Sequence, residues 1–583
     1  QTETSSYLFR DQINAGVNLF PQIANYWTHT GNYDYYNIFE QTLKDIEADR
    51  DQKIFCRLAA GIRQDGRSAL VTNVPQPGLA EAVIQERDDY LADMKASMTH
   101  EEIRQMIEDT KEFREWNETE MTNSDFPIDP SDIPDEEPYT AYEITEGDGV
   151  TYYMAPAEVE KAGSYCMYLD ISDFSDKEHM ELGLFLMLMG NMGTREHSLE
   201  EIMNLESEYL YSYQSECVYP NGEDLYPMMK LSWTTLTEDY EAGLALLLEI
   251  LGSTDFADTD RIGQLLARDG DSYDVSRAGN KQDVAISLAA SYVYRGYAYY
   301  EAYRTQEFYY YLKDIKSRLE EDPSYGTVLA ESLQSLSHKL LKKGRLILTC
   351  AAPEADLESI KTISAGLLET LESKEAAANP APLPQPVQKQ AVIVESPDQY
   401  TVTVGNCYEQ EGFSGTYVPF LMAASDRYLV PKLRFQMGAY SCSSSFSPYT
   451  GSVLLYTYSD PNGAETLKVF EGTADAIANM ELTQEELDGY ILTAIATSGM
   501  ARGVLAKPLR AMDEAIAGRD TGDACHAVNT MKQASTEDQK AAAEYFRQVL
   551  SQAGTATVGS ETQLKADQNA YDQLLSYKAG GKE

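Results

Sequence analysis

The stretch that decides the fold runs from Leu79 to Pro138 and reads LAEAVIQERDDYLADMKASMTHEEIRQMIEDTKEFREWNETEMTNSDFPIDPSDIPDEEP. Apolar residues recur at helical spacing in its first two thirds, which predicts two helices with a break between them. The break has the form of a capping box, because Thr99 precedes Glu102 by three positions. The first helix should place five apolar side chains on one face: Val83, Ile84, Leu91, Met94 and Met98.

The last part of this stretch is an acidic strap rich in proline. Pro127, Pro130 and Pro134 exclude a helix or a central strand, so we expect the strap to lie extended across a surface. An ordinary interdomain linker is one explanation of the whole stretch. Paired amphipathic helices favour a second one, a stiff hinge that joins two halves of the protein.

The hairpin and its Ser-Asp-Ile-Pro strap resemble the presequence-protease branch of the pitrilysin/insulinase metallopeptidases. In that family a helical hairpin joins the two halves of a clamshell. The resemblance implies an α+β fold, in which duplicated pitrilysin-type α/β sandwich domains are joined by a long helical hairpin hinge. Further matches are Met192-Gly193-Thr194, Ser459-Asp460-Pro461-Asn462 and Glu471-Gly472-Thr473, and they mark the fold rather than the chemistry.

An internal repeat predicts duplicated domains independently of the family. Helix, strand, polar break and helix follow one another from His338 to Leu371 and again from Tyr545 to Leu575, with a third copy proposed at Arg57–Val74. A domain-sized period indicates duplicated domains rather than a solenoid. In the last copy the residues from Leu564 to Leu575 are predicted to be the closing helix.

The predicted organisation has five parts. Residues 1–78 form the incomplete end of a second peptidase-like domain, and residues 79–145 form the hinge and strap. Residues 146–375 and 391–583 form a third and a fourth α+β domain, separated by a Pro/Ala linker at 376–390.

Composition limits the classes of partner. The 583 residues include 46 basic and 94 acidic ones, and the net charge of −48 argues against binding to nucleic acid or an anionic membrane. Such a chain attracts basic peptides, although a solvated acidic surface is the more common explanation. The seven cysteines form no CxxC pair, and no apolar run approaches a membrane span of about 20 residues. We therefore expect a cytoplasmic protein with free thiols.

A zinc site is not expected in this chain. The superfamily holds zinc with a His-x-x-Glu-His helix, whose two histidines face one metal ion across a helical turn. None of the six histidines belongs to such a motif. The sequence that most resembles the zinc motif begins at His197, but Glu201 stands where the motif has its second histidine. Ser198 and Glu201 have the spacing of a capping box, so this sequence is better explained as the start of a helix.

The candidate functional residues are Arg434 and Tyr440, in Arg434-Phe435-Gln436-Met437-Gly438-Ala439-Tyr440. From residue type alone, a structural arginine and a core tyrosine are the more common outcome. The family resemblance favours a functional pair, because there an Arg and a Tyr six residues later reach from the C-terminal half to the zinc site. A guanidinium can hold a peptide carbonyl or carboxylate, and a phenol can donate to the oxyanion formed when water attacks the scissile carbonyl. Members of the family often have two glycines before the Ala-Tyr pair, whereas this chain has Met437 at the first of these positions.

Three local predictions concern the surroundings of this pair. A helix should run from about Tyr417 to Tyr428, with Pro431 starting a short second helix. The strands Ser441–Phe446 and Ser452–Tyr458 should form a hairpin. Asp460 should then act as the N-cap of the next helix.

The resemblance implies the C-terminal half of a zinc metallopeptidase that degrades unstructured peptides, among them basic ones, in an enclosed chamber. This chain would supply Arg434 and Tyr440 for substrate binding and catalysis. The zinc motif would lie in an N-terminal catalytic half, fused or separate, so that this chain alone would be inactive. The alternative is a non-catalytic scaffold or peptide-binding subunit with the same fold.

Overall fold

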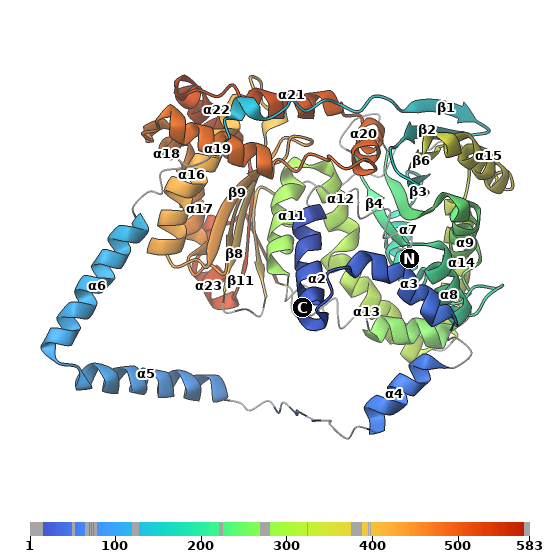
Figure 1. Cartoon of the computed structure of the whole chain (residues 1–583), viewed down its shortest axis with the longest axis horizontal. Helices are drawn as coiled ribbons and strands as arrows, with labels where there is room; N and C mark the ends of the chain where they lie inside the picture. The colour runs from blue at the N-terminus through green and yellow to red at the C-terminus, as the bar shows by residue number, and fades with distance from the viewer. Residues whose placement is uncertain are drawn as a thin grey trace. The chain divides into compact units, whose positions relative to one another are not determined.

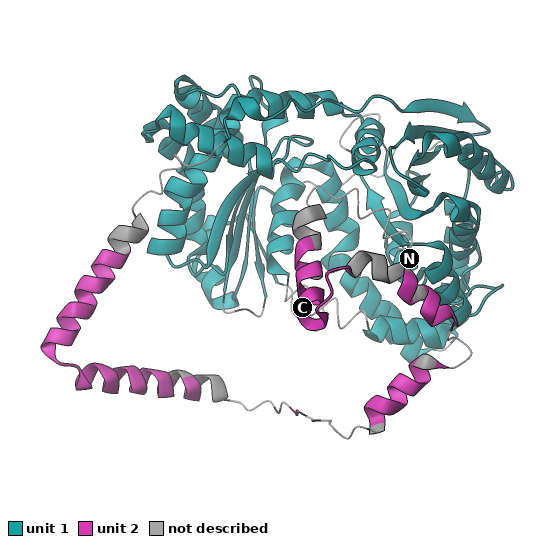
Figure 2. Ribbon diagram, viewed as in Figure 1, with its two compact units in different colours: residues 1–13, 126–583 teal, residues 14–125 magenta. Residues whose placement is uncertain are grey.

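The structure is a computed structural model, and it describes residues 15–48, 53–64, 69, 71–72, 74, 78–118, 128–220, 226–268, 280–322, 324–374, 387–394, 396 and 398–576. The chain divides into two compact units (Figure 2). Unit 2 spans residues 14–125, and unit 1 contains residues 126–583. The predicted Pro/Ala linker falls largely outside the described residues.

The described part of unit 2 is helical. Its helices are α2 (Ala15–Thr30), α3 (Tyr35–Ala48), α4 (Ile54–Gln64), α5 (Leu79–Ser97) and α6 (His100–Glu118). The helices α5 and α6 confirm the two predicted helices and the break between them, whereas their packing as a hairpin hinge stays a prediction. The Glu102 carboxylate accepts the Thr99 backbone N–H at 2.7 Å, as a capping box requires. Helix α2 was not predicted, because Pro21 lies inside it.

None of the described side chains of unit 2 is buried. On the predicted apolar face of α5, Val83 and Leu91 are half exposed. The predicted strand of the third repeat copy, Ser68–Val74, shows no strand at its described residues 69, 71, 72 and 74. That residues 1–78 are the incomplete end of a domain stays a prediction.

Unit 1 is built on two mixed sheets. Sheet I contains β1 (Glu143–Gly147), β2 (Val150–Pro156), β3 (Ala162–Asp170), β4 (Ser212–Val218), β5 (Met228–Leu236) and β6 (Leu346–Ala352). Sheet II contains β7 (Lys389–Ile393), β8 (Tyr400–Asn406), β9 (Ser441–Phe446), β10 (Ser452–Tyr458), β11 (Gly554–Gly559) and β12 (Gln573–Ser576). The predicted hairpin of β9 and β10 is confirmed, with Val453 opposite Phe446.

The two sheets share one topology, which confirms the predicted duplication. Sheet I has the order β1-β2-β6-β3-β5-β4 and sheet II the order β12-β7-β11-β8-β10-β9. In each sheet the first and last in chain order of five equivalent strands pair in parallel, β2 with β6 and β7 with β11. The remaining pairs among these five strands are antiparallel. The sixth strand has a different place in the chain in each sheet. In sheet I it is β1, which comes before the five equivalent strands, and in sheet II it is β12, which comes after them.

Strand β12 corrects the prediction of one helix from Leu564 to Leu575. The segment instead forms helix α23 (Glu561–Ala566), a short turn and then β12, which pairs in parallel with β7. Leu574 lies opposite Ala391 in this pairing and packs against the core. Pairing with a distant strand therefore outweighs the local helical preference.

Helices cover the sheets. In the sheet I region they are α7 (Asp176–Leu188), α8 (Leu199–Tyr209), α9 (Tyr240–Ser253), α11 (Lys281–Val293), α12 (Arg295–Arg304), α13 (Gln306–Glu321), α14 (Tyr325–Leu340) and α15 (Leu357–Leu368). In the sheet II region they are α16 (Val418–Ala424), α17 (Gly463–Glu471), α18 (Thr473–Asn479), α19 (Gln484–Thr497), α20 (Ala506–Ile516), α21 (Thr521–Met531) and α22 (Gln539–Ser551), with α23. Ser198 begins α8 with a capping box, which confirms the predicted helix start, and Ser175 begins α7 in the same way.

The two sheet regions exchange helices. Helix α11 of the sheet I region packs Leu288 and Ala289 against the Val402 and Val558 side of sheet II. Helix α20 of the sheet II region packs Met512 against Ala155 and Ala351 of sheet I. One face of each sheet thus packs against helices of the same region, and the other face packs against a helix of the other region. Both faces are covered, which explains why every residue of β3 is buried.

Charged and hydroxyl groups also join the two regions. Asp513 on α20 accepts hydrogen bonds from Lys230 Nζ at 2.7 Å and from the Tyr168 hydroxyl. Lys230 and Asp513 are largely shielded from solvent, so each needs the other as a partner. The exchange of helices is therefore fixed by both apolar packing and a specific ion pair.

The described part of the strap crosses the sheet II region (Figure 1) and is extended as predicted, except at the short 3-10 helix η3 (Pro130–Asp132). The prediction that its prolines exclude any helix is wrong there, because Pro130 is tolerated in the first turn of a helix. Glu136 and Asn529 on α21 form two reciprocal bonds between the strap backbone and the amide side chain, at 2.8 and 2.9 Å. Lys532 Nζ donates to the carbonyl oxygen of Ile133 at 2.8 Å and pairs with Asp135 at 2.7 Å. The strap then enters sheet I as β1, so it ties both regions of unit 1 together.

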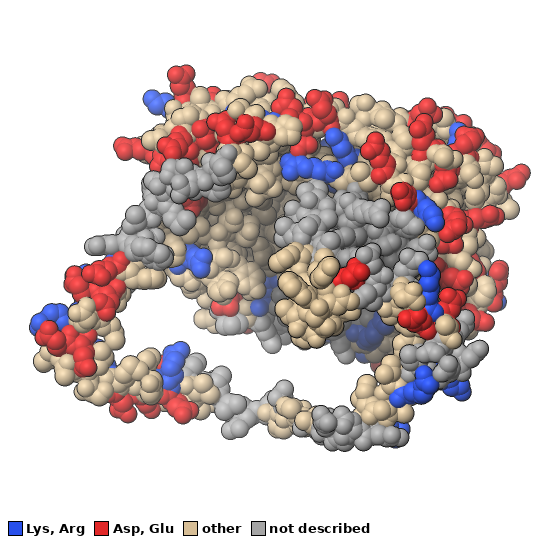
Figure 3. Space-filling view, in the orientation of Figure 1, with Lys and Arg blue, Asp and Glu red and all other residues tan. Residues whose placement is uncertain are grey.

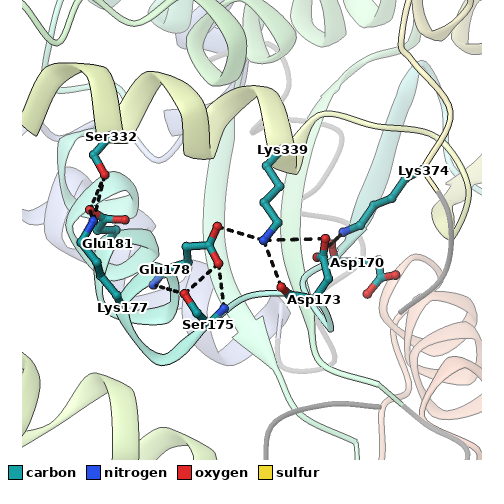
Figure 4. A network of polar contacts seen from close by, with 9 residues as sticks. All are labelled: Asp170, Asp173, Ser175, Lys177, Glu178, Glu181, Ser332, Lys339 and Lys374. Atoms are coloured by element: carbon teal, nitrogen blue, oxygen red, sulfur yellow. Dashed lines mark hydrogen bonds and ion pairs between the residues drawn. The ribbon is translucent and has the colours of Figure 1, made fainter. Parts of the chain in front are cut away.

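A polar network fixes the connection between β3 and α7 (Figure 4). Lys339 from α14 reaches Glu178 at 2.9 Å and the carbonyl oxygen of Asp173 at 3.0 Å. Lys374 pairs with Asp173 at 2.8 Å. Each ammonium group has carboxylate and carbonyl acceptors. These charged side chains therefore have a structural role.

A buried histidine lies among aromatic rings beside this network. His179 on α7 is 2% exposed, and its ring stacks on Tyr303 with centroids 4.6 Å apart. Its Nδ1 atom has no hydrogen-bond partner. Burial, and after it the positive charge of Arg304, lowers the pKa of His179 to about 4, although Asp176 and Glu178 act in the opposite direction.

The fold should lose stability in mild acid because of His179. An unfolded histidine binds a proton below about pH 6.5, whereas the folded one stays neutral down to about pH 4. Protonation therefore favours unfolding progressively as the pH falls through this window, by about 3 kcal/mol in total. Urea unfolding at a series of pH values measures this effect, and in His179→Phe the total fall in the free energy of unfolding between pH 6.5 and pH 4 should be smaller by that amount. The control His526→Phe, on the surface of α21, should keep the wild-type fall; an unchanged fall in His179→Phe would contradict the assignment.

Candidate functional site

The candidate site begins on an unusual helix. Helix α16 continues without interruption into the π-helix η8 (Ser425–Gln436), which contains both Pro431 and Arg434. The prediction that Pro431 starts a separate helix is therefore wrong. In an α-helix the proline ring would meet the carbonyl of Arg427, and the wider π-helical turn relieves that conflict.

A tight turn then connects η8 to the edge strand β9. The Met437 N–H donates to the Lys432 carbonyl and the Ala439 N–H to the Leu433 carbonyl, both at 2.9 Å. Gly438 has a φ of +86°, a left-handed conformation that glycine adopts without steric cost. The buried Ala439 anchors the turn, so the flanking residues are directed to the surface.

Arg434 and Tyr440 are both exposed, on either side of this turn. Tyr440 is 72% exposed, and the neighbouring Phe435 is 63% exposed. The Arg434 guanidinium lies 5.7 Å from the Phe435 ring centroid, and the Tyr440 ring lies 6.0 Å from that of Tyr458. This surface offers cationic, phenolic and aromatic groups to a ligand; Phe435 and Tyr458 were not predicted as part of it.

The thiol of Cys442 lies beside the pair. Burial raises the pKa of Cys442 to about 11, although the nearby Arg434 acts to lower it. The thiol is therefore protonated at neutral pH and is a poor nucleophile. All seven cysteines are free, as predicted, and Cys56 is an exposed exception among mostly buried ones.

The residues that imitate a zinc motif have structural partners. His197 Nδ1 lies 3.0 Å from Glu249, and that hydrogen bond raises the pKa of His197. Ser198 and Glu201 cap helix α8, as predicted. Among the residues that the structure describes, no three His, Cys, Asp or Glu side chains are grouped as metal ligands. The acidic run Asp269–Asp274 lies outside them.

Two family models match this chain. The model described as associated with peptidase family M16, subfamily C, matches residues 74–315, and the PreP C-terminal domain matches residues 389–558. The second match contains the whole Arg434–Tyr440 segment. With the duplicated fold, these matches define a peptidase-like protein.

Together the two models and the relatives below support a C-terminal, peptidase-like protein of the pitrilysin superfamily. Protein HypA from Clostridium perfringens is 20% identical over 491 residues, covering 82% of this chain and 50% of HypA. Presequence protease 1, chloroplastic/mitochondrial, from Arabidopsis thaliana is 22% identical over 449 residues, covering 72% of this chain and 40% of that protein. The chain thus spans about half the length, or less, of these relatives.

The solved structure of pitrilysin supports the fold. It matches with a TM-score of 0.53 and 14% identity, covering 76% of this chain and 46% of pitrilysin.

No helix in the described part of this chain is both long enough and apolar enough to cross a membrane.

Proposed function

We propose that this chain is the C-terminal half of a zinc metallopeptidase that degrades unstructured peptides in an enclosed chamber. The observation that carries the proposal is the exposure of Arg434 and Tyr440 on a rigid turn inside the matched PreP C-terminal domain. Arg434 binds the peptide backbone or a carboxylate, and Tyr440 donates a hydrogen bond to the oxyanion as the scissile carbonyl is attacked.

The described residues of this chain do not fit a zinc ion, because they provide no three-ligand group. We therefore assign the metal to an N-terminal catalytic half, fused or separate, and give this chain the substrate contacts. The net charge of −48 supports unstructured basic peptides as substrates. On the face drawn in Figure 3, acidic side chains are widely spread, with smaller groups of basic ones among them.

Replacing Arg434 with alanine in the complete protein, with its N-terminal half present, should raise KM for a short unstructured peptide. The expected increase is about 10-fold, with a smaller change in kcat, because the guanidinium contacts the substrate before and during the reaction. The control is Arg547→Ala on α22, which removes an equally charged side chain that is 45% exposed and pairs with Asp475 and Glu544. An unchanged KM in Arg434→Ala would remove Arg434 from the site.

The same assay separates the two candidate functions. A peptidase cleaves the peptide, whereas a scaffold or peptide-binding subunit binds it without cleavage. Binding measured by fluorescence anisotropy together with an absence of product, in the presence of added zinc, would favour the non-catalytic alternative.

A further inference from the structure

The position of Tyr440 is set by its backbone rather than by its side chain. The ring is 72% exposed, so packing contributes little to holding it. The Tyr440 N–H donates to two carbonyl oxygens that follow one another at the end of β10, those of Tyr458 and Ser459, both at 3.1 Å. The loop after β10 therefore determines where the phenol points.

A second contact from the same loop reaches the other side of the turn. Asn462 Nδ2 donates to the carbonyl oxygen of Met437 at 2.6 Å. Met437 directly precedes Gly438, the left-handed residue at which the chain reverses. The Asn462 amide thus holds the start of the turn, while the carbonyl oxygens of residues 458 and 459 hold its end.

The loop is itself fixed by a buried carboxylate. Asp460 is fully buried and accepts the Asn462 N–H at 2.8 Å. It also accepts the hydroxyls of Thr457 at 3.0 Å and Thr466 at 2.6 Å. Helix α17 begins only at Gly463, so the prediction that Asp460 is its N-cap is wrong. The preceding Ser459 has a φ of +51°, which a non-glycine residue adopts only when its surroundings hold it.

We propose that Asn462 is a positioning residue for Tyr440, and that the buried Asp460 holds Asn462 in place. This inference rests on the proposed function and extends it to a second layer of residues. An error of about 1 Å in the place of a donor can cost up to 10²-fold in rate, so a single amide bond to the turn is enough to matter. Asn462 acts only through the turn that carries Tyr440.

The test is a double-mutant cycle in the complete protein. Asn462→Ala should lower kcat about 10-fold on a short unstructured peptide with little change in KM. In a Tyr440→Phe background the same substitution should cause no further loss, because the donor that it positions is already gone. A purely structural role would instead lower the thermal midpoint and reduce kcat by the same factor in both backgrounds.

The control is Asn479→Ala, which removes a similar bond, from Asn479 Nδ2 to the Asp475 carbonyl at 2.7 Å, within α18. It should leave kcat unchanged. Asn462→Asp, which keeps the size but removes the donor, replaces the alanine variant if that variant does not fold. Wild-type kcat in Asn462→Ala beside an impaired Tyr440→Phe, or equal losses in both backgrounds, overturns the positioning role alone. Wild-type kcat in Tyr440→Phe overturns the proposed function, and this inference with it.

Discussion

Tyr440→Phe in the complete protein should lower kcat on a short unstructured peptide by about 10²-fold, as loss of an oxyanion donor does elsewhere. The change removes one hydroxyl and almost no volume. Because the ring is 72% exposed, the fold and its thermal midpoint should be unaffected. KM should change little, since the donor acts when charge develops on the carbonyl oxygen.

The control for this prediction is Tyr90→Phe. It makes the same chemical change in a ring of α5 that is 64% exposed and is not part of the candidate site. Tyr90→Phe should keep the wild-type kcat. Equal activity of Tyr440→Phe and the wild type would make Tyr440 an ordinary surface residue.

The duplicated fold could be predicted from the sequence because its signal is local. The helices α14 and α22 each end within a few residues of the strand that follows, β6 and β11 respectively. Such helix–strand–helix segments depend on neighbouring residues, so their patterns survive in the sequence. The common strand order of the two sheets then follows from the repeat.

The exchange of α11 and α20 could not be predicted in this way. Both helices are apolar on the side that packs, but nothing in their sequence says which sheet they cover. Strand β3 is buried on both faces, whereas the alternation of Tyr165, Met167 and Leu169 indicated only one. Contacts between residues hundreds of positions apart carry no periodic signal.

The candidate site was predicted only in part for the same reason. Arg434 and Tyr440 lie in one short segment, so a motif could find them. Tyr458 is the last residue of β10 and Asn462 lies in the loop after it, and both reach the turn only through the pairing of β9 with β10. The signal that could have found them is the Ser459–Asn462 match, whose Asp460 looked like a helix cap and is instead a buried anchor.

The joint between the two sheet regions should be sensitive to a single methyl group at Gly554. This residue begins β11, and a Cβ there would overlap the carbonyl oxygen of Ala289 and lie 2.8 Å from Tyr292 Cβ, both on α11. A backbone carbonyl cannot turn aside as a side-chain tip can, so the helix must move away from sheet II. Gly554→Ala should therefore lower the free energy of unfolding by about 2–3 kcal/mol.

Thermal unfolding of the chain measures this effect, as a fall of about 2–3 °C in the midpoint for a folded unit of this size. Gly366→Ala in α15 is the matched control, because a Cβ there meets no atom within 4 Å. Replacing a helical glycine by alanine should raise the stability by up to about 1 kcal/mol, so the two variants are expected to shift the midpoint in opposite directions. Neither glycine has a positive φ, and strain of the backbone therefore contributes to neither result. A midpoint in Gly554→Ala at or above the wild-type value would mean that α11 yields without cost, and that the exchanged helices do not hold the two regions together.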